Sequence, residues 1–75
     1  MNTKERANLV RDLKSNSVFA EGFKKIREDQ IAVFLNTQSQ IETIQKAHDI
    51  IGALNKIEDY FNTVLTDEVL FDRKN

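Results

Sequence analysis

The sequence predicts an all-α fold: a short N-terminal helix followed by a long antiparallel helical hairpin, a three-helix arrangement within one domain, 1–75. Two observations predict it. Apolar residues recur at intervals of three and four along most of the chain, which is the spacing of an amphipathic helix. The sequence has no proline and only two glycines, so it lacks the turn residues of multi-strand folds. It also has no cysteine, which excludes disulfides and thiolate metal sites.

The first helix is expected over residues 4–14, with Thr3 as its N-cap. Its apolar residues at helical spacing are Ala7, Leu9, Val10 and Leu13. Ser15-Asn16-Ser17 then interrupts the pattern with three residues that favour caps and turns. The first helix is therefore expected to end at this triplet.

The second helix is expected over residues 17–36, with Asn16 as its N-cap. Its inward face is predicted to consist of Phe19, Phe23, Ile26, Gln30 and Val33. Ile31, Phe34 and Leu35 lie on flanking arcs, so the helix is apolar on more than one side near its C-terminal end. This pattern indicates that the end of the helix faces two neighbours.

The third helix is expected over residues 39–67, about 40 Å at 1.5 Å per residue. Ser39 and Glu42 have the spacing of a capping box, in which each side chain bonds the other residue's backbone N–H. The apolar stripe that follows consists of Ala47, Ile50, Leu54, Ile57, Phe61 and Val64. Residues 68–75 are expected to form a tail, with an extension of the helix as the alternative.

The short polar break at residues 36–39 predicts that the second and third helices are antiparallel neighbours. Residues that face each other then have numbers that sum to about 76. This register places Phe19 near Ile57 and Phe23 near Leu54. The far end of the third helix, from Phe61 to Leu65, is expected to be covered by the first helix.

The net charge of −1 conceals an uneven distribution. Residues 1–27 contain seven Lys/Arg and three acids, a net charge of +4, whereas residues 28–75 contain four Lys/Arg and nine acids, a net charge of −5. One interpretation is that the basic part packs beside the acidic part. The other is a basic surface for nucleic acid, although this segment interleaves acids with its basic residues and lacks an aromatic stacking platform.

The sequence indicates no catalytic, cofactor-binding or metal-binding residues, and the chain is not expected to be an enzyme. His48 is predicted to be a surface residue, because Gln45 stands where the helical Glu-x-x-His metal motif has its glutamate. The acidic pairs Glu28-Asp29, Glu58-Asp59 and Asp67-Glu68 are adjacent in sequence and diverge around their helices. Acid–base catalysis requires carboxylates that converge on a cleft, so these pairs are expected to be solvated.

Gly22 and Gly52 lie inside predicted helices, where each costs about 1 kcal/mol relative to alanine. One interpretation is that the fold tolerates this cost. The other is that Gly52 permits close approach by the first helix or by a second copy of the chain.

Several short motifs resemble a group of helical proteins encoded by tailed bacteriophages. They are Arg6-Ala7 with Leu9 and Leu13, the run from Ser15 to Phe19 with Phe23, and Ile26-Arg27-Glu28. The chain departs from the group at Ser17, where the group has proline, and at Val69-Leu70-Phe71, where the group has a tail containing Gly-Lys. The group has no established activity and is encoded near head and packaging genes. The resemblance implies a phage origin and an accessory virion or packaging role, and it supplies no functional residues.

The leading hypothesis is a structural or interaction protein that binds a larger virion or packaging protein, such as a portal, capsid or terminase component, and that also self-associates. A host-directed inhibitor or regulator that acts by protein–protein binding is the second hypothesis, and a nucleic-acid-binding accessory is the third. The surplus apolar residues predicted to contact the partner are Ile31, Phe34, Leu35, Leu70 and Phe71.

The expected location is the host cytoplasm or the virion. No apolar run approaches the ~18 residues of a membrane span, and the polar N-terminus is unlike a signal peptide.

Overall fold

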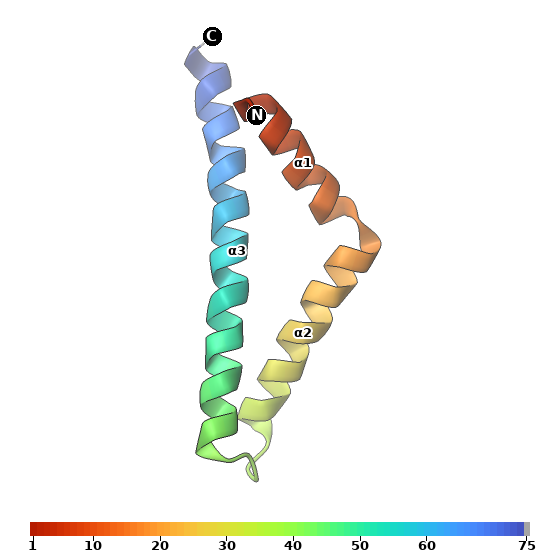
Figure 1. The fold of residues 1–75 in the computed structure, drawn as a ribbon, viewed down its shortest axis with the longest axis vertical. Coiled ribbons are helices and arrows are strands. Elements are labelled where there is room, and N and C mark those ends of the chain that lie inside the picture. The colour runs from red at the N-terminus through yellow and green to blue at the C-terminus, as the bar shows by residue number, and fades with distance from the viewer. Residues whose placement is uncertain (75) are drawn as a thin grey trace.

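A computed structural model describes residues 1–74 and contains three helices in this part of the chain: α1 (Thr3–Ser15), α2 (Ser17–Leu35) and α3 (Ile41–Lys74). The molecule is a rod of 55 × 22 × 17 Å. Helix α3 runs along its whole length, while α1 and α2 follow one another along the opposite side and meet at an elbow that points away from α3 (Figure 1). The predicted all-α fold is confirmed.

Helix α1 is capped by Asn2 and not by the predicted Thr3. The side-chain oxygen of Asn2 accepts a hydrogen bond of 2.8 Å from the backbone N–H of Glu5, and its amide nitrogen donates to the Glu5 carboxylate at 3.1 Å. An N-cap side chain bonds the N–H three residues on, and asparagine is among the best residues for this role. Thr3 therefore becomes the first residue of the helix.

A single residue, Asn16, separates α1 from α2 and forms the elbow. Its backbone is extended, with φ −71° and ψ 117°, and its side-chain oxygen accepts a hydrogen bond of 2.9 Å from the N–H of Phe19. The prediction that Asn16 is the N-cap of the second helix is confirmed. Because the cap holds Asn16 in a non-helical conformation, α1 cannot continue into α2 as one straight helix.

The predicted capping box at Ser39 does not form. The Ser39 hydroxyl instead donates a hydrogen bond of 2.8 Å to the carbonyl of Val33, one of the carbonyls at the end of α2. Helix α3 begins two residues later, where the carbonyl of Gln40 accepts from the N–H of Ile44 at 3.0 Å. Carbonyls at a helix C-terminus lack partners within the helix, so they accept hydrogen bonds from nearby donors such as this hydroxyl.

The prediction of a tail over residues 68–75 is wrong, because α3 continues to Lys74; Asn75 lies outside the described residues. The extension packs at its start, since Glu68 is buried with only 8% of its surface exposed. Phe71 lies one turn further on, close to residues 1–4 and Arg6 at the start of the chain. The first turn of the extension is thus held against α1.

The main core joins α1 to the C-terminal half of α3. Ala7, Val10 and Val64 are buried together, and Phe61 and Leu65 pack against them. This arrangement confirms that the first helix covers the far end of the third. Outside this cluster the buried apolar residues are Ala47 and Leu54 of α3, and no residue of α2 is buried.

Helices α2 and α3 are antiparallel, as predicted, and the side-chain contacts between them join residues whose numbers sum to more than 76 (Figure 1). Phe19 contacts Phe61, with ring centroids 6.2 Å apart. Arg27 contacts Asn55 and Glu58, so contacting residues have numbers that sum to between 80 and 85. Helical side chains lean toward the N-terminus of their own helix. In an antiparallel pair, two side chains that meet therefore belong to residues whose numbers sum to more than those of two residues with backbones at the same level.

Candidate protein interaction surfaces

A two-point ion pair fixes α1 to α3. Both carboxylate oxygens of Glu68 accept hydrogen bonds of 2.7 Å from the Arg11 guanidinium, and the Lys4 ammonium lies 3.7 Å from the same carboxylate. Asn8 accepts a further hydrogen bond of 2.8 Å from Arg11 and so orients the guanidinium. The bond from Arg11 is the main reason that the pKa of Glu68 is lowered from its ordinary value.

The prediction that Asp67-Glu68 is a solvated pair is therefore wrong for Glu68. The sequence contained a signal for its burial: Glu68 lies four residues after Val64 and seven after Phe61, so it continues the apolar stripe of α3. A carboxylate on a buried stripe requires a cation opposite it. The guanidinium comes from Arg11, which lies 57 residues away in sequence.

The predicted packing of the basic part beside the acidic part is confirmed at two levels of the rod. One is the Arg11–Glu68 pair, and the other is Arg27 of α2, which donates to Glu58 of α3 at 2.9 Å and to Asn55 at 3.0 Å. Glu58 is therefore also paired, although its side chain remains half exposed. Both bridges connect α3 to another helix.

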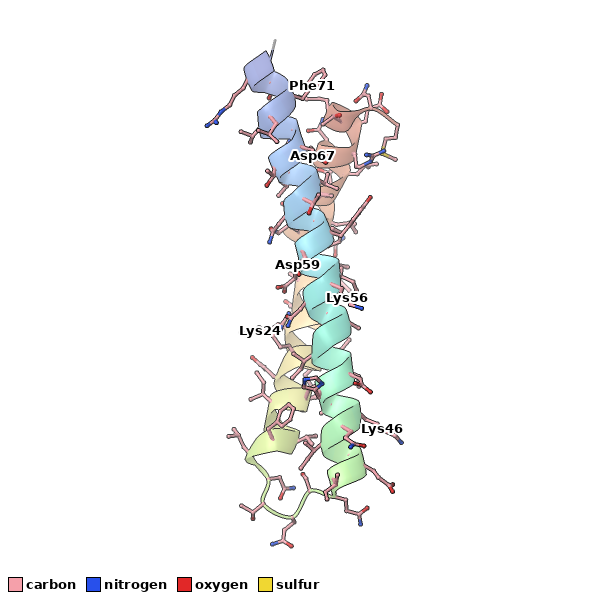
Figure 2. The ribbon with its side chains drawn as sticks, turned by 90° about the vertical axis from the view of Figure 1, so that its left-hand side faces the viewer. Lys24, Lys46, Lys56, Asp59, Asp67 and Phe71 are labelled. Carbon is pink, nitrogen blue, oxygen red and sulfur yellow. The ribbon has the colours of Figure 1, made fainter. Side chains whose placement is uncertain are left out.

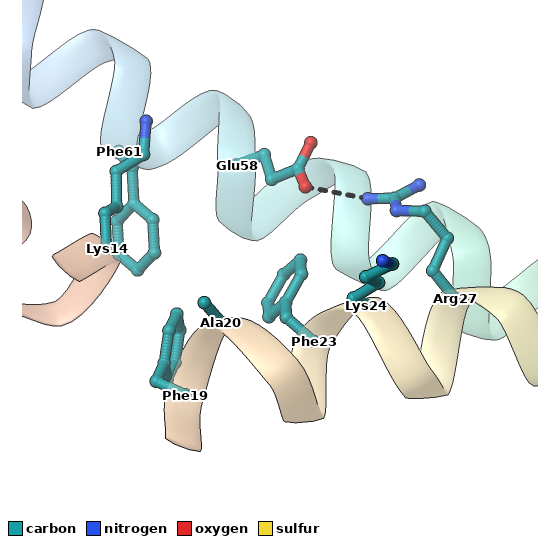
Figure 3. A pocket seen from close by; sticks show the side chains of 8 residues that line it. All are labelled: Lys14, Phe19, Ala20, Phe23, Lys24, Arg27, Glu58 and Phe61. Atoms are coloured by element: carbon teal, nitrogen blue, oxygen red, sulfur yellow. Dashed lines mark hydrogen bonds and ion pairs between the residues drawn. The ribbon is translucent and has the colours of Figure 1, made fainter. Parts of the chain in front are cut away.

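An aromatic groove of about 300 Å³ lies at the elbow, where the three helices meet. Three phenyl rings line it: Phe19 and Phe23 are 5.5 Å apart between centroids, and Phe61 faces Phe19 from α3 (Figure 3). The other lining residues are Lys14, Ala20, Lys24, Arg27 and Glu58. The groove thus combines apolar rings with three cations and one carboxylate.

The sequence predicted that the three phenyl rings lie in the core, and it did not predict the groove. Phe19, Phe23 and Phe61 are each only partly buried, because the elbow at Asn16 holds the first turns of α2 away from α3 (Figure 1). The break at residues 15–17 indicated a change of direction. It did not indicate the angle, which decides whether the rings close against one another or line an open groove.

The five predicted contact residues are all exposed but form two separate groups. Ile31, Phe34 and Leu35 lie together at the end of α2, with 44%, 44% and 78% of their surfaces exposed. Leu70 and Phe71, each 50% exposed, lie in the last turns of α3 at the opposite end of the rod. The structure therefore does not bring the whole set to one site.

Two residues of the first group, Ile31 and Phe34, are continuous with the aromatic groove. Ala20, Lys24, Arg27, Ile31 and Phe34 follow one another along α2 at intervals of four, three, four and three. This spacing places them along one side of the helix. We call the side formed by these five residues the docking side of α2; its first three members also line the groove.

His48 is exposed, as predicted, and its Nδ1 lies 3.9 Å from a carboxylate oxygen of Asp49. A Cβ added at Gly22 or Gly52 would meet no atom within 4 Å, so the suggestion that Gly52 receives the first helix is wrong. Within residues 1–74 no group of three or more His, Cys, Asp or Glu is arranged to hold a metal ion. In the same range, no helix combines the length and apolar character of a membrane span.

Comparison of the chain with known protein families, with curated proteins and with solved structures gives no match. The resemblance to the phage proteins stays a prediction.

Proposed function

We propose that this chain is a non-enzymatic interaction protein that binds a larger protein through the docking side of α2 and the aromatic groove. The observation that carries the proposal is the continuity of these two surfaces. Apolar and cationic side chains extend without interruption from the three phenyl rings to Phe34 at the other end of the helix.

The thin core supports the proposal. The five buried apolar residues include two alanines, Ala7 and Ala47, and α2 buries no residue at all. Fully burying a large aliphatic side chain contributes about 1.5–3 kcal/mol to stability. The apolar side chains of α2 are only partly buried or exposed, so they contribute less than this. A partner that covers the docking side would recover the difference.

The chemistry of the surface specifies the partner segment. An amphipathic helix that lies in a groove is held by apolar anchors at intervals of three and four. The three rings suit an aromatic or aliphatic anchor, and Lys14, Lys24 and Arg27 at the rim favour carboxylates beside it. We therefore expect an acidic amphipathic helix on the partner.

The resemblance to the phage proteins is the ground for proposing a virion or packaging protein as the partner. A host enzyme or defence complex is the alternative, and purified virions separate the two, because a structural role requires the chain in the particle. A nucleic-acid partner is disfavoured. At least five of the seven basic side chains in residues 1–27 lie within 4.0 Å of a carboxylate.

Two neighbouring lysines provide a matched test. Lys24 lies on the docking side and Lys25 does not, yet their side chains are similarly exposed, at 77% and 73%, and each has an acid four residues on. We expect Lys24→Glu to abolish capture of the partner from phage-infected cells by the tagged full-length chain. Lys25→Glu should retain capture, because its charge change is equal but lies on another side of α2. Equal capture by both variants, or no protein captured above background, would contradict the proposal.

A further inference from the structure

The side of the α2–α3 seam opposite the Arg27–Glu58 bridge is apolar. Arg27 and Glu58 are hydrogen-bonded at 2.9 Å, so both point to one side of the seam. Ile26 and Ile57 each precede one of these residues and are rotated back by about 100° around their helices. Because the two helices are antiparallel, these rotations place both Ile26 and Ile57 on the side of the seam that faces away from the Arg27–Glu58 bridge.

Further apolar residues extend this side along the rod. Ile50 lies seven residues before Ile57 and therefore on the same face of α3, and Tyr60 lies one turn after Ile57. Val18 lies two turns before Ile26 on α2. We call these five residues the apolar flank; their exposed fractions are 77% for Val18, 45% for Ile26, 39% for Ile50, 41% for Ile57 and 58% for Tyr60.

The charges that border the apolar flank are balanced. Lys25 and Asp29, on either side of Ile26, are bonded to each other at 2.7 Å, and Lys46 and Asp49 precede Ile50. Figure 2 shows that Lys46, which borders the apolar flank, lies on one side of the rod, whereas Lys24 of the docking side lies on the other. A two-fold interface places a patch against a copy of itself, so a patch with net charge would repel its copy, whereas this one would not.

The size of the apolar flank places it at the centre of a dimer interface. A stable interface buries about 800 Å² on each partner. The flank spans about 15 Å of α3, from Ile50 to Tyr60 at 1.5 Å per residue. It would therefore form the apolar centre of the interface, and polar residues before and after it along the 55 Å rod would supply the remaining area. Chains of this size commonly complete their cores by oligomerisation.

We infer that a second copy of the chain packs against the apolar flank, forming a symmetric dimer in which the two α2–α3 hairpins lie side by side. This interface is separate from the docking side, so the dimer can present two docking sides to larger partners. The inference does not rest on the proposed function.

Ile26 and Ile31 form a matched pair for the test, since both are on α2 and are 45% and 44% exposed. Ile26 belongs to the apolar flank and Ile31 to the docking side. In sedimentation equilibrium at about 10–100 μM, we expect the wild-type chain and Ile31→Glu to have twice the monomer mass. A two-fold interface contains each substitution twice, so Ile26→Glu should weaken dimerisation by about a hundredfold. Far-UV circular dichroism should show unchanged helicity in both variants.

Tyr60 provides a second readout that needs no substitution. It is the only tyrosine in a chain without tryptophan, so its fluorescence should change when the wild-type protein is diluted through its dissociation constant. A wild-type monomer at 100 μM, or equal weakening by Ile26→Glu and Ile31→Glu, would overturn the inference. Neither result would affect the partner-capture test with Lys24→Glu and Lys25→Glu.

Discussion

Leu54→Ala tests whether the seam between α2 and α3 stabilises the fold. Leu54 is the largest buried apolar side chain, with 7% of its surface exposed. The substitution removes three carbon atoms, and at about 0.8 kcal/mol for each buried methylene the lost transfer free energy is about 2.4 kcal/mol.

Two further effects determine how far Leu54→Ala lowers the free energy of unfolding. The cavity left behind adds a further cost, so that Leu→Ala substitutions in cores span about 2–5 kcal/mol. Ile50 and Ile57, one turn before and after Leu54, are 39% and 41% exposed and can move into the space. We therefore expect the free energy of unfolding to fall by about 2–3 kcal/mol. For a domain of this size, the thermal midpoint would fall by about 10–20 °C.

The assay is thermal unfolding followed by far-UV circular dichroism, with Leu35→Ala as the matched control. Leu35 is 78% exposed near the turn, so the same substitution there should change the free energy of unfolding by less than about 0.5 kcal/mol. Equal midpoints for Leu54→Ala and the wild type would show that the seam does not stabilise the fold and would refute the hairpin packing.

Two further predictions concern α3. The pKa of Glu68 is lowered from 4.5 by its bond with Arg11, so the stability it contributes is present above pH 4.5 and is lost as the pH falls through the lower folded-state value. Glu68→Gln should therefore be less stable than the wild type at pH 7, and the difference in thermal midpoint should narrow on acidification below pH 4.5; a constant difference would contradict the role of the ion pair. Gly52→Ala should raise the free energy of unfolding by about 0.5–1 kcal/mol, because the added methyl group meets open space. A fall in the denaturation midpoint of Gly52→Ala would instead show that another chain contacts this position.

The sequence predicted features that depend on local chemistry. Asn16 caps α2 as expected, because an N-cap involves only residues three positions apart. Ser39 has equally suitable local chemistry but bonds the carbonyl of Val33, which the fold of the loop brings within reach. A capping pattern therefore predicts a helix start correctly only when no contact with another part of the chain draws the capping side chain away.

Features that depend on distant residues were missed. The last turns of α3 were expected to be a tail, because residues 69–71 are consecutive apolar residues. The ion pair of Glu68 was not predicted, since its cation lies on another helix. The exposure of Ile31, Phe34 and Leu35 followed from helical spacing alone. The aromatic groove did not, since it depends on the angle at Asn16, which no spacing rule supplies.

The central claim is that the folded chain leaves an apolar surface that another polypeptide covers. The most direct test is the thermal midpoint of the wild-type protein over a hundredfold range of concentration. Binding of a second copy stabilises the folded state by mass action, so the midpoint should rise with concentration, and Ile26→Glu should abolish the rise while Ile31→Glu retains it. A midpoint that is independent of concentration would contradict the claim that a second copy covers the apolar flank.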